Sequence, residues 1–184
     1  TQRVDQDGFT VNYAYDVVGR LTTLTDAGGN RIVSYVYDSV GRLSRKDLGN
    51  GATTAYERDG AGNPFAIINR APNGSVISRF DYFYDSLNRL VRASTPEGEW
   101  NYTYDALHQL AGVTLPGGRA ITYQYDGAGN RVSVTDAGTV TPYVANRMNQ
   151  YTGVGAAVYT YDAAGNLIGK VEGWGIGPAT NLRT

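Results

Sequence analysis

The chain contains no cysteine, and only one histidine and one methionine, among its 184 residues. It can therefore form neither a disulfide nor a thiolate metal site. Charged residues make up 18% of the chain and the formal net charge is −1. This near-neutral composition lacks the basic patch with which proteins bind nucleic acid or anionic membranes. No apolar run reaches the roughly 18 residues of a membrane helix, so we expect no membrane insertion.

Tyrosine, in contrast, is abundant and periodic. Fourteen of the 15 tyrosines fall in eight copies of one phrase, Tyr-x-Tyr-Asp-x-x-Gly, and the leading tyrosines are 22, 21, 26, 20, 21, 20 and 16 residues apart. A fixed period near 20 residues indicates one small unit stacked many times. The copies begin at Tyr13, Tyr35, Tyr56, Tyr82, Tyr102, Tyr123, Tyr143 and Tyr159.

Each copy predicts a β-hairpin. Residues 9–15 alternate in the manner of a strand, Asp16–Gly19 is typical of a type I turn, and residues 20–25 return as the second strand. Glycine-rich or proline-containing turns then lead to the next copy, for example Pro72-Asn73-Gly74. The chain is predicted to be all-β, an antiparallel meander of repeated hairpins with about 16 short strands.

The turn residues carry the strongest prediction. The fourth turn position holds only glycine, asparagine or histidine, the residues that best tolerate a left-handed backbone. The first position holds aspartate, or asparagine once, which can accept hydrogen bonds from the turn's N–H groups. The structural turn residues are Asp16, Gly19, Asp38, Gly41, Asp59, Gly62, Asp85, Asn88, Asp105, His108, Asp126, Gly129, Asn146, Asn149, Asp162 and Gly165.

Two features leave alternatives open. The residue after each turn is polar, as in Arg20 and Asn63, and it either faces water or bonds to the neighbouring hairpin. Leu21 and Leu24 are three residues apart, so in a regular strand they would face opposite sides. Either a β-bulge intervenes or both faces of the sheet are partly covered.

Functional interpretations of single residues are weak, because most notable residues recur in every copy. His108 could act as a general base near Asp105, but it occupies the left-handed turn position, so we predict no catalytic residue and no enzyme. The aspartates are too far apart for a calcium loop, and we predict no metal and no cofactor. The tyrosines favour a packing ladder over a sugar-stacking surface. Trp100, outside the tyrosine frame, is the better candidate for a contact surface.

The pattern Tyr-x-Tyr-Asp-x-x-Gly-Arg-Leu, clean at 13–21, 35–43 and 82–90, resembles the YD or Rhs repeat of bacterial surface and toxin proteins and of the animal teneurins. The copy at Tyr56 departs from it at Arg58 and Pro64, and the copy at Tyr143 lacks the second tyrosine and the aspartate. The resemblance covers about residues 9–170 and implies that the hairpins curl as part of a spiral β shell.

This resemblance also implies a function. Members of the family often enclose the toxic part of their own polypeptide, and some are thought to bind carbohydrate. We expect residues 1–170 to be a structural array that encapsulates or displays such a part, secreted or on the bacterial cell surface within a longer protein. The alternative is a module that binds a cell-surface glycan or receptor. The self-cleaving motif of this family contains an Asp-Pro dipeptide. No Asp-Pro occurs in this chain, so we expect no self-cleavage.

Two expectations concern the ends of the array. Residues 171–184 are predicted to form a glycine-rich tail that caps the last hairpin or is disordered, with Trp174 in it. The outermost strands of an open array have unpaired edges, which favour association with other chains. We therefore expect the isolated piece to self-associate.

Overall fold

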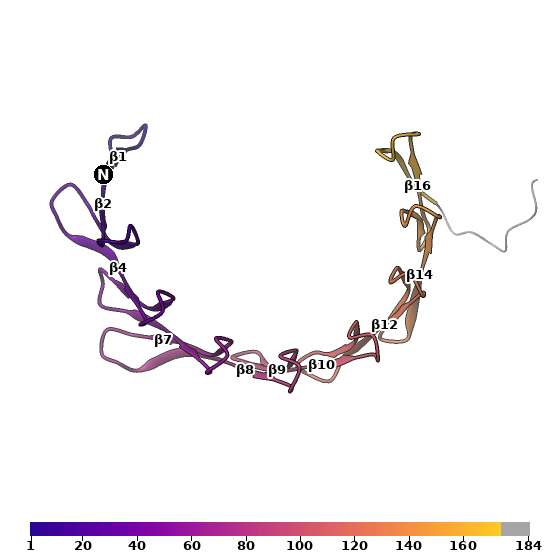
Figure 1. Ribbon diagram of the computed structural model, residues 1–184, viewed down its shortest axis with the longest axis horizontal. Coiled ribbons are helices and arrows are strands. Elements are labelled where there is room, and N and C mark those ends of the chain that lie inside the picture. The colour runs from indigo at the N-terminus through magenta and orange to yellow at the C-terminus, as the bar shows by residue number, and fades with distance from the viewer. Residues whose placement is uncertain (174–184) are drawn as a thin grey trace, which may run out of the picture. The chain divides into compact units, whose positions relative to one another are not determined.

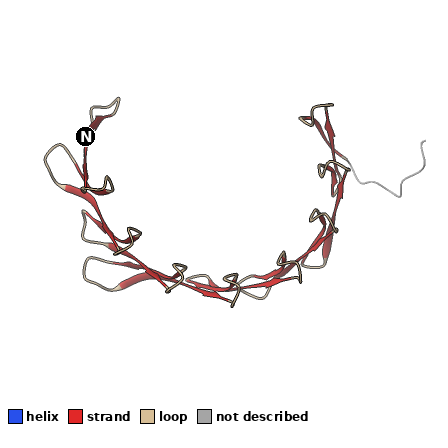
Figure 2. Cartoon of the chain, in the orientation of Figure 1, coloured by secondary structure: helices blue, strands red, loops and turns tan. Residues whose placement is uncertain are grey.

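The computed structural model describes residues 1–173, and these contain seventeen strands and no helix (Figures 1 and 2). Each strand pairs antiparallel with its neighbours in the chain, and the first and last strands have one such neighbour each. The all-β meander predicted from the repeat is therefore confirmed. The count exceeds the expected 16 by one because a short strand, β1, pairs with β2 ahead of the first copy. Since the described part has no helix, it has none that could cross a membrane.

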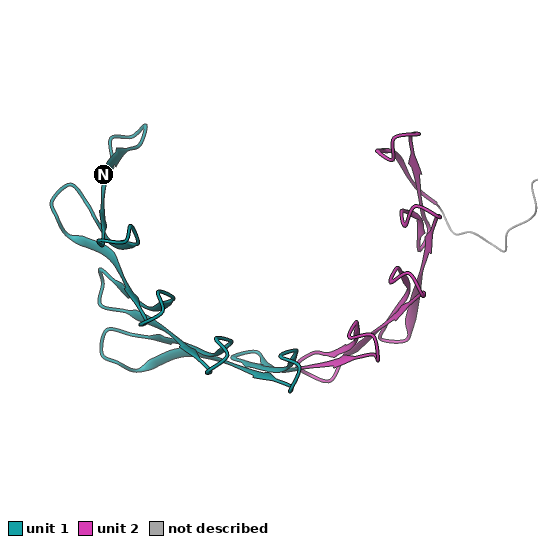
Figure 3. Cartoon of the chain, viewed as in Figure 1, with its two compact units in different colours: residues 1–100 teal, residues 101–184 magenta. Residues whose placement is uncertain are grey.

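The chain divides into two compact units, residues 1–100 and 101–184 (Figure 3). The boundary lies within one strand, β10 (Gly98–Tyr104). The first unit contains β1 (Gln2–Val4), β2 (Thr10–Tyr15), β3 (Leu21–Thr25), β4 (Arg31–Tyr37), β5 (Leu43–Leu48), β6 (Thr53–Arg58), β7 (Pro64–Arg70), β8 (Val76–Tyr84) and β9 (Leu90–Thr95). The second contains β11 (Leu110–Thr114), β12 (Ala120–Tyr125), β13 (Arg131–Asp136), β14 (Thr139–Ala145), β15 (Tyr151–Val154), β16 (Ala157–Tyr161) and β17 (Leu167–Glu172).

A β-bulge explains the three-residue spacing of the apolar positions. In the first hairpin Tyr15 pairs with Leu21 and Ala14 with Thr23, so Thr22 has no partner across the strand. The skipped residue brings Leu21 and Leu24 to the same face of the sheet, where they pair across the strands with Tyr15 and Tyr13. Of the two alternatives left open by the sequence, the bulge is the one found. The same register shift occurs in all eight repeat hairpins.

The sheet is a single layer with little fully buried surface. We call the face that carries Tyr13, Tyr15 and their equivalents the tyrosine face. In residues 1–173 few hydrophobic side chains are buried, namely Val33, Ala66, Ile68, Ala93 and Val113. Most globular domains bury one sheet face against a second layer. Here most strand side chains are only half-buried, and stability must come largely from contacts between neighbouring hairpins.

The predicted tail lies almost entirely outside the described residues. Strand β17 ends at Glu172, two residues beyond the expected end of the array at residue 170. Trp174 and the residues that follow it lie outside the part of the chain that the structure describes.

Candidate functional site

The repeated turns, here called the aspartate turns, share one geometry. In the turn Asp38–Gly41 the N–H of Gly41 donates to the Asp38 carbonyl at 3.0 Å, and the N–H of Asp38 donates to the Arg42 carbonyl at 2.8 Å. The fourth residue is left-handed, with φ of 86° at Gly41. This is a type I turn followed by a left-handed residue, a common three-residue hairpin loop.

All eight fourth positions have a positive φ, including the three that are not glycine. Asn88 has φ 59°, His108 65° and Asn149 58°. A left-handed residue with a side chain is uncommon, and asparagine and histidine are among the types that adopt it. The glycines of the row are Gly19, Gly41, Gly62, Gly129 and Gly165, with φ of 84°, 86°, 96°, 84° and 88°.

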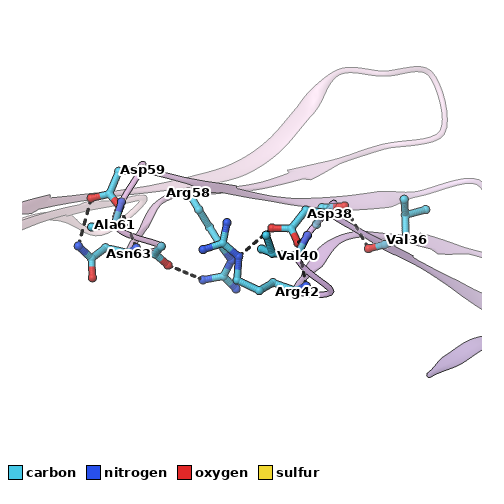
Figure 4. A network of polar contacts seen from close by, with 10 residues as sticks. Val36, Asp38, Val40, Arg42, Arg58, Asp59, Ala61 and Asn63 are labelled. Carbon is cyan, nitrogen blue, oxygen red and sulfur yellow. Dashed lines mark hydrogen bonds and ion pairs between the residues drawn. The ribbon is translucent and has the colours of Figure 1, made fainter. Parts of the chain in front are cut away.

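The first residue of each turn satisfies several donors with one side chain. The Asp38 Oδ1 atom accepts the N–H groups of Val40 and Arg42 at 3.1 and 2.8 Å, and its Oδ2 accepts the Arg42 Nε at 2.8 Å (Figure 4). The pKa values of Asp16, Asp38 and Asp85 are lowered, chiefly by the backbone N–H of the arginine four residues on. These carboxylates thus act as ionised caps of the turn.

The turn without an aspartate closes in the same way. Asn146 Oδ1 accepts the N–H groups of Met148 and Gln150 at 2.9 and 3.1 Å. Its side-chain amide also donates to the Gln150 Oε1 at 2.8 Å. An amide oxygen therefore replaces the carboxylate without loss of the backbone bonds, and the degraded copy keeps its hairpin.

In the first unit the residues after three of the turns, Arg20, Arg42 and Asn63, reach the next turn. Nη1 of Arg20 lies 3.1 Å from the place where a Cβ on Gly41 would stand, and Nη1 of Arg42 lies 2.5 Å from that of Gly62. Nδ2 of Asn63 donates to Oδ1 of Asn88 at 3.1 Å. These contacts match the second alternative that the sequence left open for this position. They stack each turn on the one before it.

The second unit repeats this stacking with different side chains. Nε2 of Gln109 lies 3.2 Å from the place where a Cβ on Gly129 would stand. Nδ2 of Asn130 donates to Oδ1 of Asn149 at 2.9 Å, and Nε2 of Gln150 donates to the carbonyl of Gly165 at 3.0 Å. Glycine in this position leaves room for the preceding side chain as well as permitting the left-handed backbone.

Tyrosine hydroxyls form a second set of bonds between hairpins. The hydroxyl of Tyr37 donates to the Leu21 carbonyl at 2.7 Å, and that of Tyr84 donates to the Pro64 carbonyl at 3.0 Å. In the second unit the hydroxyl of Tyr125 donates to the Leu110 carbonyl at 2.9 Å. The second tyrosine of a copy thus bonds to the first strand residue after the preceding aspartate turn. Partly buried tyrosines generally need such a hydroxyl partner.

The degraded copy compensates for its missing tyrosine. Ala145 has no hydroxyl, but Tyr151, from the leucine position of the same copy, accepts the Arg131 N–H through its hydroxyl oxygen at 2.9 Å. Its ring lies 5.4 Å from that of Tyr143. The hydroxyl of Tyr161 in turn donates to the Tyr151 carbonyl at 2.9 Å. The one tyrosine outside the repeat frame therefore continues the contacts between hairpins.

The residues considered for chemistry lie in structural positions. Oδ1 of Asp105, the carboxylate nearest His108 in sequence, accepts the N–H groups of Leu107 and Gln109 at 2.9 and 2.8 Å. Within residues 1–173 no group of three or more histidine, aspartate or glutamate side chains could hold a metal ion. Trp100 lies in β10 two residues before Tyr102, so it shares the tyrosine face and is half-buried. Val33, buried, holds the equivalent place before Tyr35.

Comparison with known proteins agrees with this geometry. The family model described as RHS Repeat matches residues 1–31, 37–76 and 104–141, more than half of the chain. No curated protein matches the sequence. A chain in the Photorhabdus luminescens Tc holotoxin pore, mutation TccC3-D651A, is 21% identical with a TM-score of 0.69 over 90% of this chain. Crystal structures of TcdB2-TccC3 and TcdB2-TccC3-Cdc42 give 21% and 22% identity with TM-scores of 0.70 and 0.69.

These solved structures share the fold with this chain. The matched stretch makes up 90% of this chain but only 11% to 12% of each solved chain. The solved chains are therefore far longer. The comparison therefore concerns a stretch of hairpins within a large protein.

Proposed function

The chain belongs to the RHS repeat family, and we propose that it is a wall segment of a bacterial Rhs-type shell that encloses or displays a toxin or effector part of its own polypeptide. The observation that carries this is the single-layer array. Each strand pairs with its chain neighbours, and the residue after a turn contacts the next turn in both units, so the wall can be extended by adding hairpins. Its role in this proposal is structural and non-catalytic.

The partners in this proposal are further repeats and the enclosed part of the same polypeptide. Solved neighbours carry toxin names, including the Tc holotoxin pore, which supports a secreted or cell-surface location within a longer protein. Within the described residues β1 pairs only with β2, and β17 only with β16. The outer edges of these strands are therefore the places where further repeats would pair, and where isolated copies would self-associate.

Limited proteolysis of the longest natural polypeptide that contains the array tests the proposal. We expect the part outside the repeats to resist protease while the array is folded, and to become sensitive when Gly41→Val and Gly62→Val together open the turns. The conservative control is Gly60→Ala, a turn glycine without positive φ and with no atom within 4 Å of an added Cβ. Equal sensitivity of the three proteins would overturn the enclosing role.

Binding of a cell-surface glycan or receptor stays a prediction, with Trp100 as its residue. The half-buried position of Trp100 on the tyrosine face gives this alternative no added support. A glycan array on which binding disappears with Trp100→Ala would favour it over the wall.

A further inference from the structure

Two arginines stand on the tyrosine face at places where the repeat normally has an uncharged residue. Arg58 occupies the position of the second tyrosine in its copy and pairs with Pro64. Arg131 occupies the position that is leucine in five other copies and pairs with Tyr125. Both side chains are half-buried.

The same two arginines hold the buried side-chain atoms of the described residues that lack a hydrogen-bond partner. In residues 1–173 the buried side-chain nitrogen and oxygen atoms without a hydrogen-bond partner are Nε of Arg58 and Nε of Arg131. Native proteins satisfy nearly all such atoms, so each exception calls for a physical reason. Here the exceptions coincide with the two arginines that break the repeat pattern.

Neither guanidinium has a counter-ion in the described part of the chain. The arginines that follow the turns do: Arg20 and Arg42 bind Asp16 and Asp38 at 2.7 and 2.8 Å. Arg58 instead donates Nη1 to the Gly62 carbonyl at 3.3 Å. A guanidinium stays charged at any ordinary pH, so its charge is left uncompensated.

The carboxylate that follows Arg58 in the chain, Asp59, is already engaged. Figure 4 shows Arg58 between two successive aspartate turns. Oδ1 and Oδ2 of Asp59 accept donors of Ala61 and Asn63 from its own turn. Nη1 of Arg42 also reaches Gly62, so two guanidinium groups converge there while Asp38 neutralises only Arg42. Lys46, over the Tyr56 ring at 5.6 Å, adds a further cation on this face.

Arg131 has a comparable setting in the second unit. Its guanidinium lies 4.9 Å from the centre of the Tyr123 ring and 5.6 Å from that of Tyr143. Asp126 accepts bonds from its own turn, and Asp136 binds Arg119. Tyrosine rings attract a cation but do not neutralise it.

We propose that Arg58, in the first unit, and Arg131, in the second, are separate binding sites, each for a carboxylate side chain of an acidic polypeptide segment that lies on the tyrosine face. A carboxylate accepts two parallel bonds from a guanidinium and supplies the missing charge. The face is suited to such a segment because its unpaired charges are positive and lie among tyrosine rings. The inference rests on the proposed function for the origin of the segment, which is the polypeptide that the wall encloses.

Substitutions that restore the repeat pattern at positions 58 and 131 should stabilise the fold and remove the proposed binding sites. A tyrosine at position 58 would place its hydroxyl toward the Leu43 carbonyl, as Tyr37 and Tyr84 do in their copies. A leucine at position 131 would remove a desolvated charge. Residues that break a local rule without a structural gain commonly serve binding, and these two fit that description.

Titration with a hexaglutamate peptide at low salt, followed by calorimetry, tests the proposal. We expect Arg58→Tyr and Arg131→Leu each to remove one of two bound peptides, and the double variant to weaken binding at least tenfold. The matched control is Arg70→Tyr, because Arg70 also donates Nη1 to a turn carbonyl, that of Gly74, at 3.3 Å, and carries the same charge. It should bind the peptide within twofold of the wild type.

The melting temperature separates loss of binding from loss of fold. Arg58→Tyr should melt at or above the wild-type temperature, and Arg58→Gln, which removes only the charge, should show the same loss of binding. Unchanged binding in the double variant, or an equal loss in Arg70→Tyr, would overturn the site. So would binding of hyaluronate, an acidic polysaccharide, without binding of hexaglutamate. The proteolysis experiment fails or succeeds separately, since it needs no peptide.

Discussion

The aspartate turn and the connecting turn of a repeat have nearly the same backbone conformation, but different contacts hold them. In the aspartate turn Asp38–Gly41 and the connecting turn Ala71–Gly74, the fourth N–H donates to the first carbonyl at 3.0 and 2.9 Å, and φ of the glycine is 86° and 84°. Only the first has a carboxylate cap and a neighbour on its glycine, the Arg20 guanidinium. An added Cβ on Gly74 would meet no atom within 4 Å.

This difference shows which contacts make a row of hairpins from single hairpins. The left-handed residue sets the turn itself, at both ends alike. The aspartate caps its own turn, and the polar residue after the turn makes the contacts that reach the next hairpin. The polar residues after the aspartate turns therefore couple one repeat to the next, and connecting turns such as Ala71–Gly74 lack this contact.

The largest effect should come from a branched side chain at the stacked glycine. Gly41→Val forces a β-branched residue into the left-handed region and displaces Arg20, and should lower the free energy of unfolding by about 2–3 kcal/mol. Gly74→Val, strained but unstacked, should lower it by about 1–2 kcal/mol. Urea denaturation measures both. Equal losses would show that the Arg20 contact contributes nothing.

Removal of a cap should have the next largest effect. Asp38→Ala leaves two N–H groups and the Arg42 side chain without their acceptor, so the urea midpoint of unfolding should fall, and by more than in Asn50→Ala. Asn50→Ala, in a connecting turn, removes one hydrogen bond, in which Oδ1 accepts the Ala52 N–H at 3.0 Å. Its loss of unfolding free energy should stay below about 1 kcal/mol. A larger loss for Asn50→Ala in urea titration would reverse the ranking of the two turns.

Acid should weaken the aspartate turns. The pKa values of Asp16, Asp38 and Asp85 are lower in the folded chain than in the unfolded one. Their contribution to stability is therefore complete above the unfolded value of about 3.9 and is lost as the pH falls through the lower folded values. We expect the melting temperature to be steady from neutral pH down to about pH 5 and to fall below about pH 4. In Asp38→Asn the fall should be shallower, and an identical slope would refute this role.

The smallest effect concerns a strained connecting turn. Ala137 has φ 47°, a left-handed value that alanine rarely adopts. Ala137→Gly should relieve this strain and raise the free energy of unfolding by up to about 1 kcal/mol. Ala27→Gly, at a turn position without positive φ, should instead lower it by about 0.5–1 kcal/mol. Thermal melts of the two variants check the opposite signs.

Local chemistry alone was enough to predict the hairpins. The period of the tyrosines, the aspartate at the turn and the short list of residues at the left-handed position all act within one copy, so each can be recognised in the sequence. The register shift at Thr22 was visible only as an odd spacing of leucines. Both a bulge and a doubly covered sheet explain that spacing, and only the strand pairing of Ala14 with Thr23 distinguishes them.

The tertiary structure alone decided what happens between copies. Hydrogen bonds from Tyr37 to the Leu21 carbonyl and from Gln150 to the Gly165 carbonyl join residues that are 16 and 15 positions apart. No local rule predicts which polar atoms meet over that distance, because the meeting depends on the register of the intervening strands. For the same reason the sequence could not predict the role proposed for Arg58 and Arg131. Their departures from the pattern can be read in the sequence, whereas their lack of a counter-ion depends on which carboxylates the neighbouring turns have already engaged.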